Sequence, residues 1–389
     1  MRRLLHRESE PHYMSELASY SIQAVFFALI AVAVVSRSKK TDLYQFALIT
    51  IWLIGVIAIY VRYREGQVLF YSNDQDFHKL IINYYIPVEG IHLNAFFGLR
   101  YILTIPVYLI AKLGFDAMLL LKFIQLVFLL LLYRQAKIYL ARGAVVLRFW
   151  HITCIAGPIT IFMSLLSLRD LILAYCAVAF MANKSIGYRV FIIVLALCLR
   201  PHLAVALAFG FVAAEIFTRI HKSKPILYLI IFAVLSYALG CLAFPIGAVI
   251  QHHATFDSPS TVFSQLKFSR LVINFVGLQF LALNDENGLI VARSTFSLLL
   301  SRIVFFDTIL IPILFLKSAV SRISFQTKEK VLVLTSFLFF YGVVSQTTWN
   351  STRQNIPFLA CMGVLAVADI EHFRKIKAKV APKLLMATR

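Results

Sequence analysis

Apolar segments of about 20 residues recur along the whole chain, and this repetition constrains the fold more than any other feature. The 389 residues are 60% hydrophobic and only 14% charged, whereas a soluble domain carries about 25% charged residues. About 20 consecutive apolar residues are needed for a helix to cross the hydrocarbon core of a bilayer. The sequence therefore predicts an all-α, polytopic integral membrane protein.

The candidate membrane spans are distributed from one end of the chain to the other. They lie at 17–35, 42–61, 98–113, 115–133, 149–166, 169–183, 189–200, 202–218, 226–244, 297–316, 331–345 and 356–370. Because several are shorter than a full crossing requires, we expect about 10 to 13 transmembrane helices joined by irregular outer loops. No soluble domain or repeat interrupts them, which predicts a single transmembrane domain over residues 1–389.

The charge of the chain is strongly basic, with 38 Lys and Arg against 18 Asp and Glu, a formal net charge of +20. The basic residues gather in short loops between the apolar segments and in the segment 371–389. This distribution is the positive-inside pattern, which sets the orientation of membrane helices. We therefore interpret the charge as a topology signal and expect no nucleic acid partner.

An orientation follows when the basic segment 371–389 is placed in the cytoplasm as a tail. Alternation then puts the loops 245–296 and 346–355 outside, together with both charged ends of the segment 164–203. The early loop 62–97 also lies outside if the segment 98–113 is an interfacial or re-entrant helix. That segment is short and contains Arg100, Pro106 and Lys112.

The segment 164–203 is predicted to be a central charged hairpin of two apolar helices joined by Asn183–Lys184–Ser185. Arg169 and Asp170 open its first helix. Ionisable residues at or near bilayer depth are functional by default. An arginine offers paired donors suited to phosphate, so we assign Arg169 and Asp170 to substrate binding. The alternatives are that Arg169 snorkels to the interface and that Asp170 only caps the helix.

The second charged motif of the hairpin is Arg200–Pro201–His202. Proline breaks the helix, and broken helices at membrane depth occur where they line protein or a water-filled cavity. We therefore assign Arg200 to substrate binding and His202 to catalysis, as a general base or hydrogen-bond donor. The alternative is a polar loop between two short helices at the outer surface.

Two predicted outer loops supply the remaining candidate residues. In 62–97, Asp74 and Asp76 lie two residues apart, and such carboxylates can deprotonate a sugar hydroxyl or hold a divalent cation. A solvated turn explains them equally well. In 346–355, Trp349, Asn350 and Arg353 offer an indole, an amide and a guanidinium, which suit sugar rings, sugar hydroxyls and phosphate.

The order of these motifs resembles the Wzy-type bacterial polysaccharide repeat-unit polymerases, especially their EpsG-like branch. The resemblance covers residues 60–215 and rests on Asp74 and Asp76 with Tyr84–Tyr85, on Arg169–Asp170 opening an apolar helix, and on His202 one helix later. Asp170 stands where many members of the family have Gln, and Arg200–Pro201 is not a required feature of it.

The resemblance implies a multi-pass enzyme of the bacterial inner (cytoplasmic) membrane. Its activity would be glycosyl transfer that polymerises undecaprenyl-pyrophosphate-linked oligosaccharides into surface polysaccharide at the outer face. The expected partners are that lipid-linked oligosaccharide and the lipid bilayer, with a chain-length regulator and a flippase as further candidates. Arginines can bind the phosphates, so no metal cofactor is required, while a divalent cation at Asp74 and Asp76 stays an alternative.

Two other classes of protein remain open. The first is a GT-C type glycosyltransferase that uses a polyprenyl-phosphate sugar donor, although its acidic loop usually follows the first span and here would follow the second. The second is a flippase or transporter for a lipid-linked glycan. A flippase needs charged positions on both faces of the membrane, whereas the motifs of this chain concentrate on one predicted face.

The shared outer face of the two loops is directly testable. In a protein whose native cysteines are replaced by Ala, single substitutions Asp74→Cys and Asn350→Cys should both react with a membrane-impermeant maleimide added from outside. Labelling at position 350 but not at position 74 would place the loops on opposite faces and refute a shared site.

Overall fold

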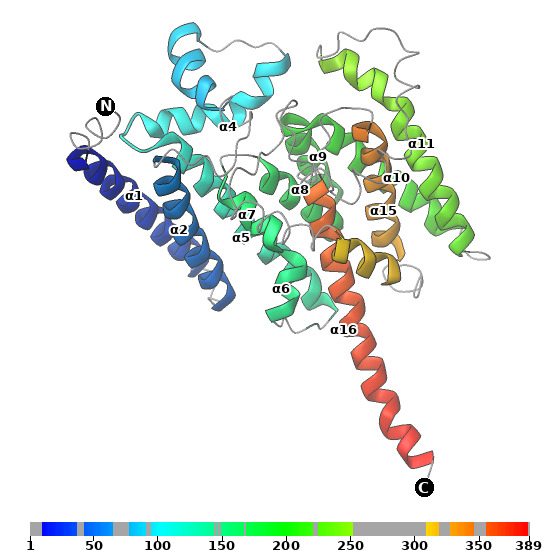
Figure 1. The fold of residues 1–389 in the computed structure, drawn as a ribbon. Coiled ribbons are helices and arrows are strands. Elements are labelled where there is room, and N and C mark those ends of the chain that lie inside the picture. The colour runs from blue at the N-terminus through cyan, green and yellow to red at the C-terminus, as the bar shows by residue number, and fades with distance from the viewer. Residues whose placement is uncertain are drawn as a thin grey trace, which may run out of the picture. The chain divides into compact units, whose positions relative to one another are not determined.

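The computed structural model describes residues 10–36, 43–64, 78–90, 95–143, 145, 149–166, 169–220, 225–251, 309–318, 327–345 and 355–387. Within these ranges the chain forms helices joined by turns, and no strand is present (Figure 1). The all-α fold expected from the sequence is therefore confirmed.

The helices are named in chain order. They are α1 (Glu10–Ser36), α2 (Leu43–Arg64), the π-helix η1 (Ile81–Glu89), α4 (Ala95–Ala111), α5 (Ala117–Arg142), α6 (Phe149–Ile155), α7 (Pro158–Ser164), α8 (Asp170–Ala182), α9 (Ile186–Leu199), α10 (Pro201–Ile220), α11 (Pro225–Gln251), α15 (Thr327–Ser345) and α16 (Ile356–Ala387). A further short helix covers Ile309–Ser318.

Five helices of the described chain are long and apolar enough to cross a membrane. Their membrane-length segments are Met14–Val34, Leu43–Val61, Ala117–Arg142, Pro201–Ile220 and Ile226–Ala243. Three shorter apolar helices, Asp170–Ala182, Ile186–Leu199 and Ile309–Ser318, accompany them. The protein is thus a multi-pass membrane protein, while the total of about 10 to 13 crossings stays a prediction.

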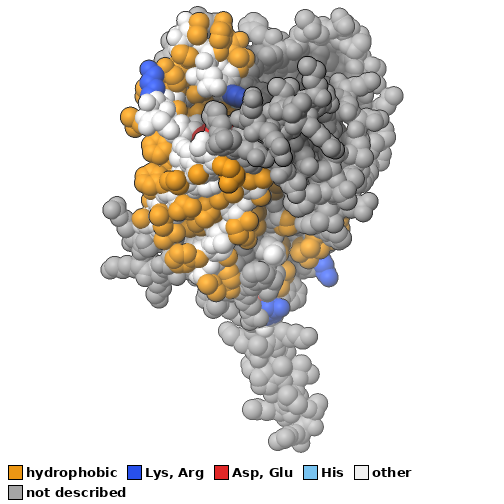
Figure 2. Space-filling model, turned by 60° about the vertical axis from the view of Figure 1, so that its left-hand side comes forward, with side chains coloured by type: hydrophobic (Ala, Val, Ile, Leu, Met, Phe, Trp, Pro, Cys, Tyr) orange, Lys and Arg blue, Asp and Glu red, His pale blue; other side chains and the backbone are white. Residues whose placement is uncertain are grey.

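Many of the exposed side chains of the described helices are large and apolar, as contact with lipid requires. On α9 the exposed side chains include Val190, Phe191 and Val194, and on α11 they include Ile230 and Val234. In the face drawn in Figure 2 the described side chains are mostly hydrophobic, with Lys and Arg at only a few positions. Such a surface is stable in a bilayer and unstable in water.

The helices cluster into two compact units. The first consists of Met1–Leu130, Thr160–Arg169 and Asn284–Leu300, and the second of Leu131–Ile159, Asp170–Leu283 and Ser301–Arg389. In the first unit α1 packs against α2, and Trp52 of α2, which is fully buried, donates its indole N–H to the carbonyl of Ser164 at 3.0 Å.

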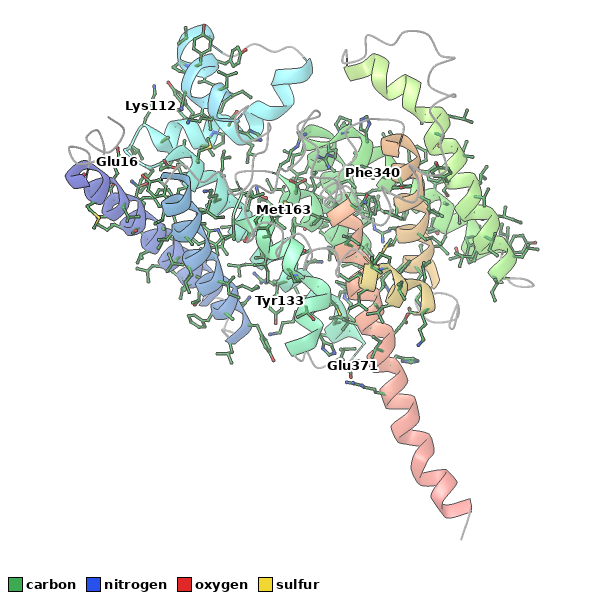
Figure 3. All side chains as sticks on the ribbon, viewed as in Figure 1. Glu16, Lys112, Tyr133, Met163, Phe340 and Glu371 are labelled. Carbon is green, nitrogen blue, oxygen red and sulfur yellow. The ribbon has the colours of Figure 1, made fainter. Side chains whose placement is uncertain are left out.

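In the second unit, α8 lies in the interior and α15 packs extensively against its neighbours. Of the thirteen residues of α8, all but Tyr175 are buried, because α9 and α16 pack against this helix. Helix α15 packs along both α10 and α11. Tyr133 and Phe340, labelled in Figure 3, are among the fully buried side chains of this unit.

The structure corrects one predicted span. The apolar segment 149–166 is not a single helix, because it forms α6 and α7, which are separated at Ala156–Gly157. Each has seven residues, or about 10 Å of helix, far less than a bilayer crossing. Pro158 is the first residue of α7, and at this position of a helix the missing N–H of proline has no energetic cost.

Three predicted boundaries also move. Helix α11 continues to Gln251, into the segment expected to be the outer loop 245–296. Helix α16 continues through Ala387, so most of the basic tail 371–389 is helical. In the segment 62–97, the described residues 78–90 include η1 and are helical up to Glu89, not loop.

Glycines set the distance between α11 and α15. A Cβ atom added to Gly240 would lie 2.1 Å from the carbonyl oxygen of Phe339, and one added to Gly342 would lie 2.5 Å from that of Tyr237. Neither contact is sterically possible, so each glycine permits the backbone of the other helix to approach. Small residues have this role at helix crossings in membranes.

The substitution Gly240→Ala should therefore destabilise the protein by about 1–3 kcal/mol, because the added methyl group forces the two backbones apart. Gly187→Ala is the matched control, since a Cβ atom there meets nothing within 4 Å. The measurement is thermal unfolding in detergent micelles followed by circular dichroism. Equal unfolding midpoints for the two variants would contradict the close crossing.

Candidate functional site

Helices α9 and α10 meet at a break centred on Arg200. The backbone of Arg200 leaves helical geometry (φ −156°, ψ 93°), and its N–H still donates to the carbonyl of Ala196 at 2.7 Å. Its own carbonyl accepts from the N–H groups of Leu203 and Ala204. Arg200 thus ends α9 and caps α10, and Pro201 occupies the favoured first position of α10.

The side chain of Arg200 faces Asp170, the first residue of α8. One guanidinium nitrogen lies 4.0 Å from a carboxylate oxygen of Asp170. Arg200 is 9% exposed and Asp170 is 2% exposed, so this is a buried ion pair. The sequence placed these two residues at the same end of the charged hairpin, and the structure does bring them together.

The other two residues of the predicted hairpin site flank this pair. Arg169 precedes α8 by one residue and is half buried, and His202 is half buried in the first turn of α10. Arg169 belongs to the first compact unit, whereas Asp170, Arg200 and His202 belong to the second. The binding of one phosphate by both Arg169 and Arg200 therefore stays a prediction.

The remaining predicted site residues lie outside the described part of the chain. These are Asp74 and Asp76 in the early loop and Trp349, Asn350 and Arg353 in the late loop. Their convergence on the hairpin stays a prediction that rests on the topology. Among the described residues, no group of three or more His, Cys, Asp or Glu side chains could hold a metal ion.

The opposite end of α8 is capped by two arginines. Arg142 donates to the carbonyl of Ala182, and Arg189 donates to that of Phe180 at 3.2 Å. Cations at this position satisfy the last carbonyls of a helix and its negative dipole end. Arg189 also stacks over the ring of Phe211, with 4.9 Å from its guanidinium carbon to the ring centroid.

These contacts bear on the predicted topology. Lys328 pairs with Glu215 and lies over the same Phe211 ring as Arg189. Arg142, Arg189 and Lys328 come from three basic segments of the kind that the positive-inside pattern predicts to be cytoplasmic, and the structure gathers them at one end of this unit. Asp170 and Arg200 lie at the other end of α8. The side of the membrane on which each end lies stays a prediction, because the predicted alternation counted 149–166 as one crossing.

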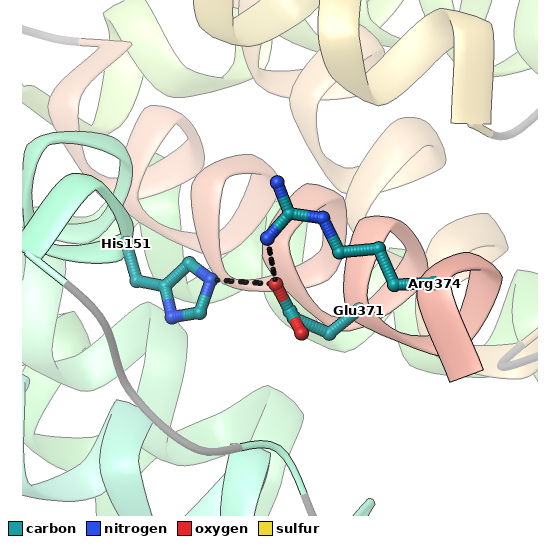
Figure 4. A network of polar contacts seen from close by, with 3 residues as sticks. All are labelled: His151, Glu371 and Arg374. Carbon is teal, nitrogen blue, oxygen red and sulfur yellow. Dashed lines mark hydrogen bonds and ion pairs between the residues drawn. The ribbon is translucent and has the colours of Figure 1, made fainter. Parts of the chain in front are cut away.

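Two buried charge clusters were not assigned a role by the sequence. His151 of α6 lies 3.2 Å from a carboxylate oxygen of Glu371, which Arg374 also contacts at 2.8 Å (Figure 4). Lys330 pairs with Asp369 at 2.8 Å, and both are buried. The available signal was an ionisable residue inside or beside each predicted span, but the sequence does not identify partners so far apart in the chain.

Comparison with known proteins leaves the site to be interpreted from its own residues. No protein-family model, no curated protein and no solved structure matches this chain.

The ion pair can be tested by a double-mutant cycle with Asp170→Asn and Arg200→Met. Each single change leaves a buried charge without its partner and should cost about 3–5 kcal/mol in the free energy of unfolding. The double variant should cost clearly less than the sum of the two. Denaturant titration in mixed micelles measures these values. Strict additivity would mean that the two side chains do not interact.

Proposed function

We propose that this protein is a membrane-embedded glycosyl-transfer enzyme that polymerises undecaprenyl-pyrophosphate-linked oligosaccharide units at the outer face of the bacterial inner membrane. The observation that carries the proposal is the buried Arg200–Asp170 pair at the break between α9 and α10. A charge pair at a broken apolar helix indicates a binding function, because both features are costly in a bilayer.

The surroundings of Arg200 favour an anionic ligand. Helix α8 begins at Asp170 and α10 begins at Pro201, so two helix N-termini with positive dipole ends lie at the pair. The guanidinium has five N–H donors in a planar arrangement that matches phosphate oxygens. One guanidinium nitrogen lies 4.0 Å from a carboxylate oxygen of Asp170. In the proposed complex, a phosphoryl oxygen of the substrate binds to Arg200.

The proposed reaction assigns a role to each group. The acceptor sugar hydroxyl attacks the anomeric carbon of the donor sugar, and a new C–O bond forms as the bond to the pyrophosphate breaks. The lipid pyrophosphate leaves with the electron pair, and Arg200 with Arg169 and Arg353 stabilises its charge. His202, or one of Asp74 and Asp76, takes the proton of the acceptor hydroxyl.

The proposal is tested by measuring the length of the polymer on a gel. The polymer is taken from cells in which the native gene is deleted and replaced by the gene of each variant. Arg169→Ala, Arg200→Ala and His202→Ala should each abolish or strongly shorten the polymer at unchanged protein level. Arg219→Ala is the matched control, because Arg219 is an exposed residue in the last turn of α10, at the opposite end from Arg200.

Wild-type polymer from all three site variants would refute the site. Arg200→Lys separates charge from geometry, because lysine keeps the charge but loses the paired donors. We expect it to be nearly as defective as Arg200→Ala. Full activity of Arg200→Lys would mean that a point charge suffices.

A further inference from the structure

The first compact unit contains a buried lysine that the reaction above does not use. Lys122 lies in the second turn of α5, within a membrane-length apolar segment, and is only 8% exposed. A lysine ammonium is strongly hydrated in water, so its burial in apolar surroundings has a high free-energy cost. A residue retained at such a cost requires a partner.

Within the described residues, the contacts of Lys122 do not satisfy its ammonium. Among the described residues, its hydrogen bond goes to the hydroxyl of Tyr20 on α1, at 3.4 Å, and the Asp116 carboxylate interacts with its charge from a longer distance. An ammonium has three N–H donors. Tyr20 is 4% exposed, and its own O–H proton has no acceptor among the described side chains. Buried donors are normally paired, so these two converging donors indicate an acceptor-rich ligand.

The helices around the two donors are held firmly. Gln23 of α1 accepts a hydrogen bond from the backbone N–H of Asp116 at 2.8 Å, and the Asp116 carboxylate caps α5 through the N–H of Leu119 at 2.7 Å. The ring of Tyr20 stacks on that of Tyr60 of α2, with centroids 3.9 Å apart. A donor held in this way, as Tyr20 is, loses less side-chain freedom when a ligand binds.

The position of the cluster along the helices is also informative. Tyr20 lies in the first half of α1, Tyr60 near the end of α2 and Lys122 near the start of α5. The first half of α1, the end of α2 and the start of α5 are therefore on one side of the unit. In the predicted topology it is the outer side.

We propose that Lys122 and Tyr20 bind the phosphoryl group of a second lipid-linked substrate. This inference rests on the proposed function, because polymerisation joins two lipid-linked glycans and Arg200 accounts for only one of them. Lysine binds phosphate as a point charge, and the Tyr20 hydroxyl adds a hydrogen bond to the same oxygen atoms. The apolar helices around the cluster suit the lipid chain.

Isothermal titration of the purified protein in detergent micelles with farnesyl pyrophosphate tests the proposal. The wild type should bind two molecules per chain, and Lys122→Met and Arg200→Met should each bind one. Lys122→Arg should retain two, and Tyr20→Phe should bind about tenfold more weakly at this site. Lys112→Met is the matched control, because Lys112 is an exposed lysine of the same unit.

Two molecules bound to Lys122→Met with wild-type affinities would overturn the proposal. Thermal unfolding without ligand shows whether Lys122→Met folds. If it does not fold, the Tyr20→Phe variant is the test, and binding by Tyr20→Phe that equals that of the wild type overturns the proposal. The source of the phosphate is tested in nanodiscs whose anionic lipid is phosphatidylglycerol. If farnesyl pyrophosphate binds at the Lys122-dependent site in phosphatidylcholine nanodiscs but not in phosphatidylglycerol nanodiscs, a membrane lipid headgroup occupies the site. That result would overturn the assignment of the site to substrate.

Polymer formation in cells distinguishes a failure of this proposal from a failure of the proposed function. A Lys122-dependent site in a wild-type protein that makes no polymer would support the site and refute the glycosyl-transfer activity. Unaltered polymer from Lys122→Met would refute the role of the site while leaving the activity in place.

Discussion

The burial of α8 is the constraint on which the second unit depends. Thirteen residues give a helix of about 20 Å, shorter than the hydrocarbon core of about 30 Å, so its ends cannot both reach water. Protein groups must therefore satisfy them. Asp170 and Arg200 meet at its first turn, and Arg142 and Arg189 bind its last carbonyls. The neighbouring helices are positioned by these contacts as much as by apolar packing.

Much of this arrangement could be predicted from the sequence, because the relevant signals are local. The turn Asn183–Ser185 and the break at Pro201 were both predicted correctly, since polar residues and proline interrupt an apolar helix wherever they occur. The error at 149–166 has the opposite cause. Hydropathy measures how well a segment tolerates lipid and carries no information on whether its helix is continuous. The break at Gly157–Pro158 was therefore not predicted.

The candidate site was predicted only in part. Asp170 and Arg200 lie 30 residues apart in the chain, yet they are joined by one hairpin, so orientation alone brings them to the same end. Lys330 and Asp369, or His151 and Glu371, are paired by helix packing that no local pattern encodes. Lys122 was missed because it lies inside an otherwise apolar segment and its partner, Tyr20, is a residue that composition treats as hydrophobic.

Helix α16 has a mechanical consequence. It is one uninterrupted helix of 32 residues, about 48 Å long, and Figure 1 shows its last turns extending past the other helices of its unit. Asp369 and Glu371 attach its middle to Lys330 and His151. The turns of α16 before Asp369 and the basic turns after Arg374 therefore belong to one continuous helix that is held at its middle. A displacement of either part of this helix is opposed by these buried contacts.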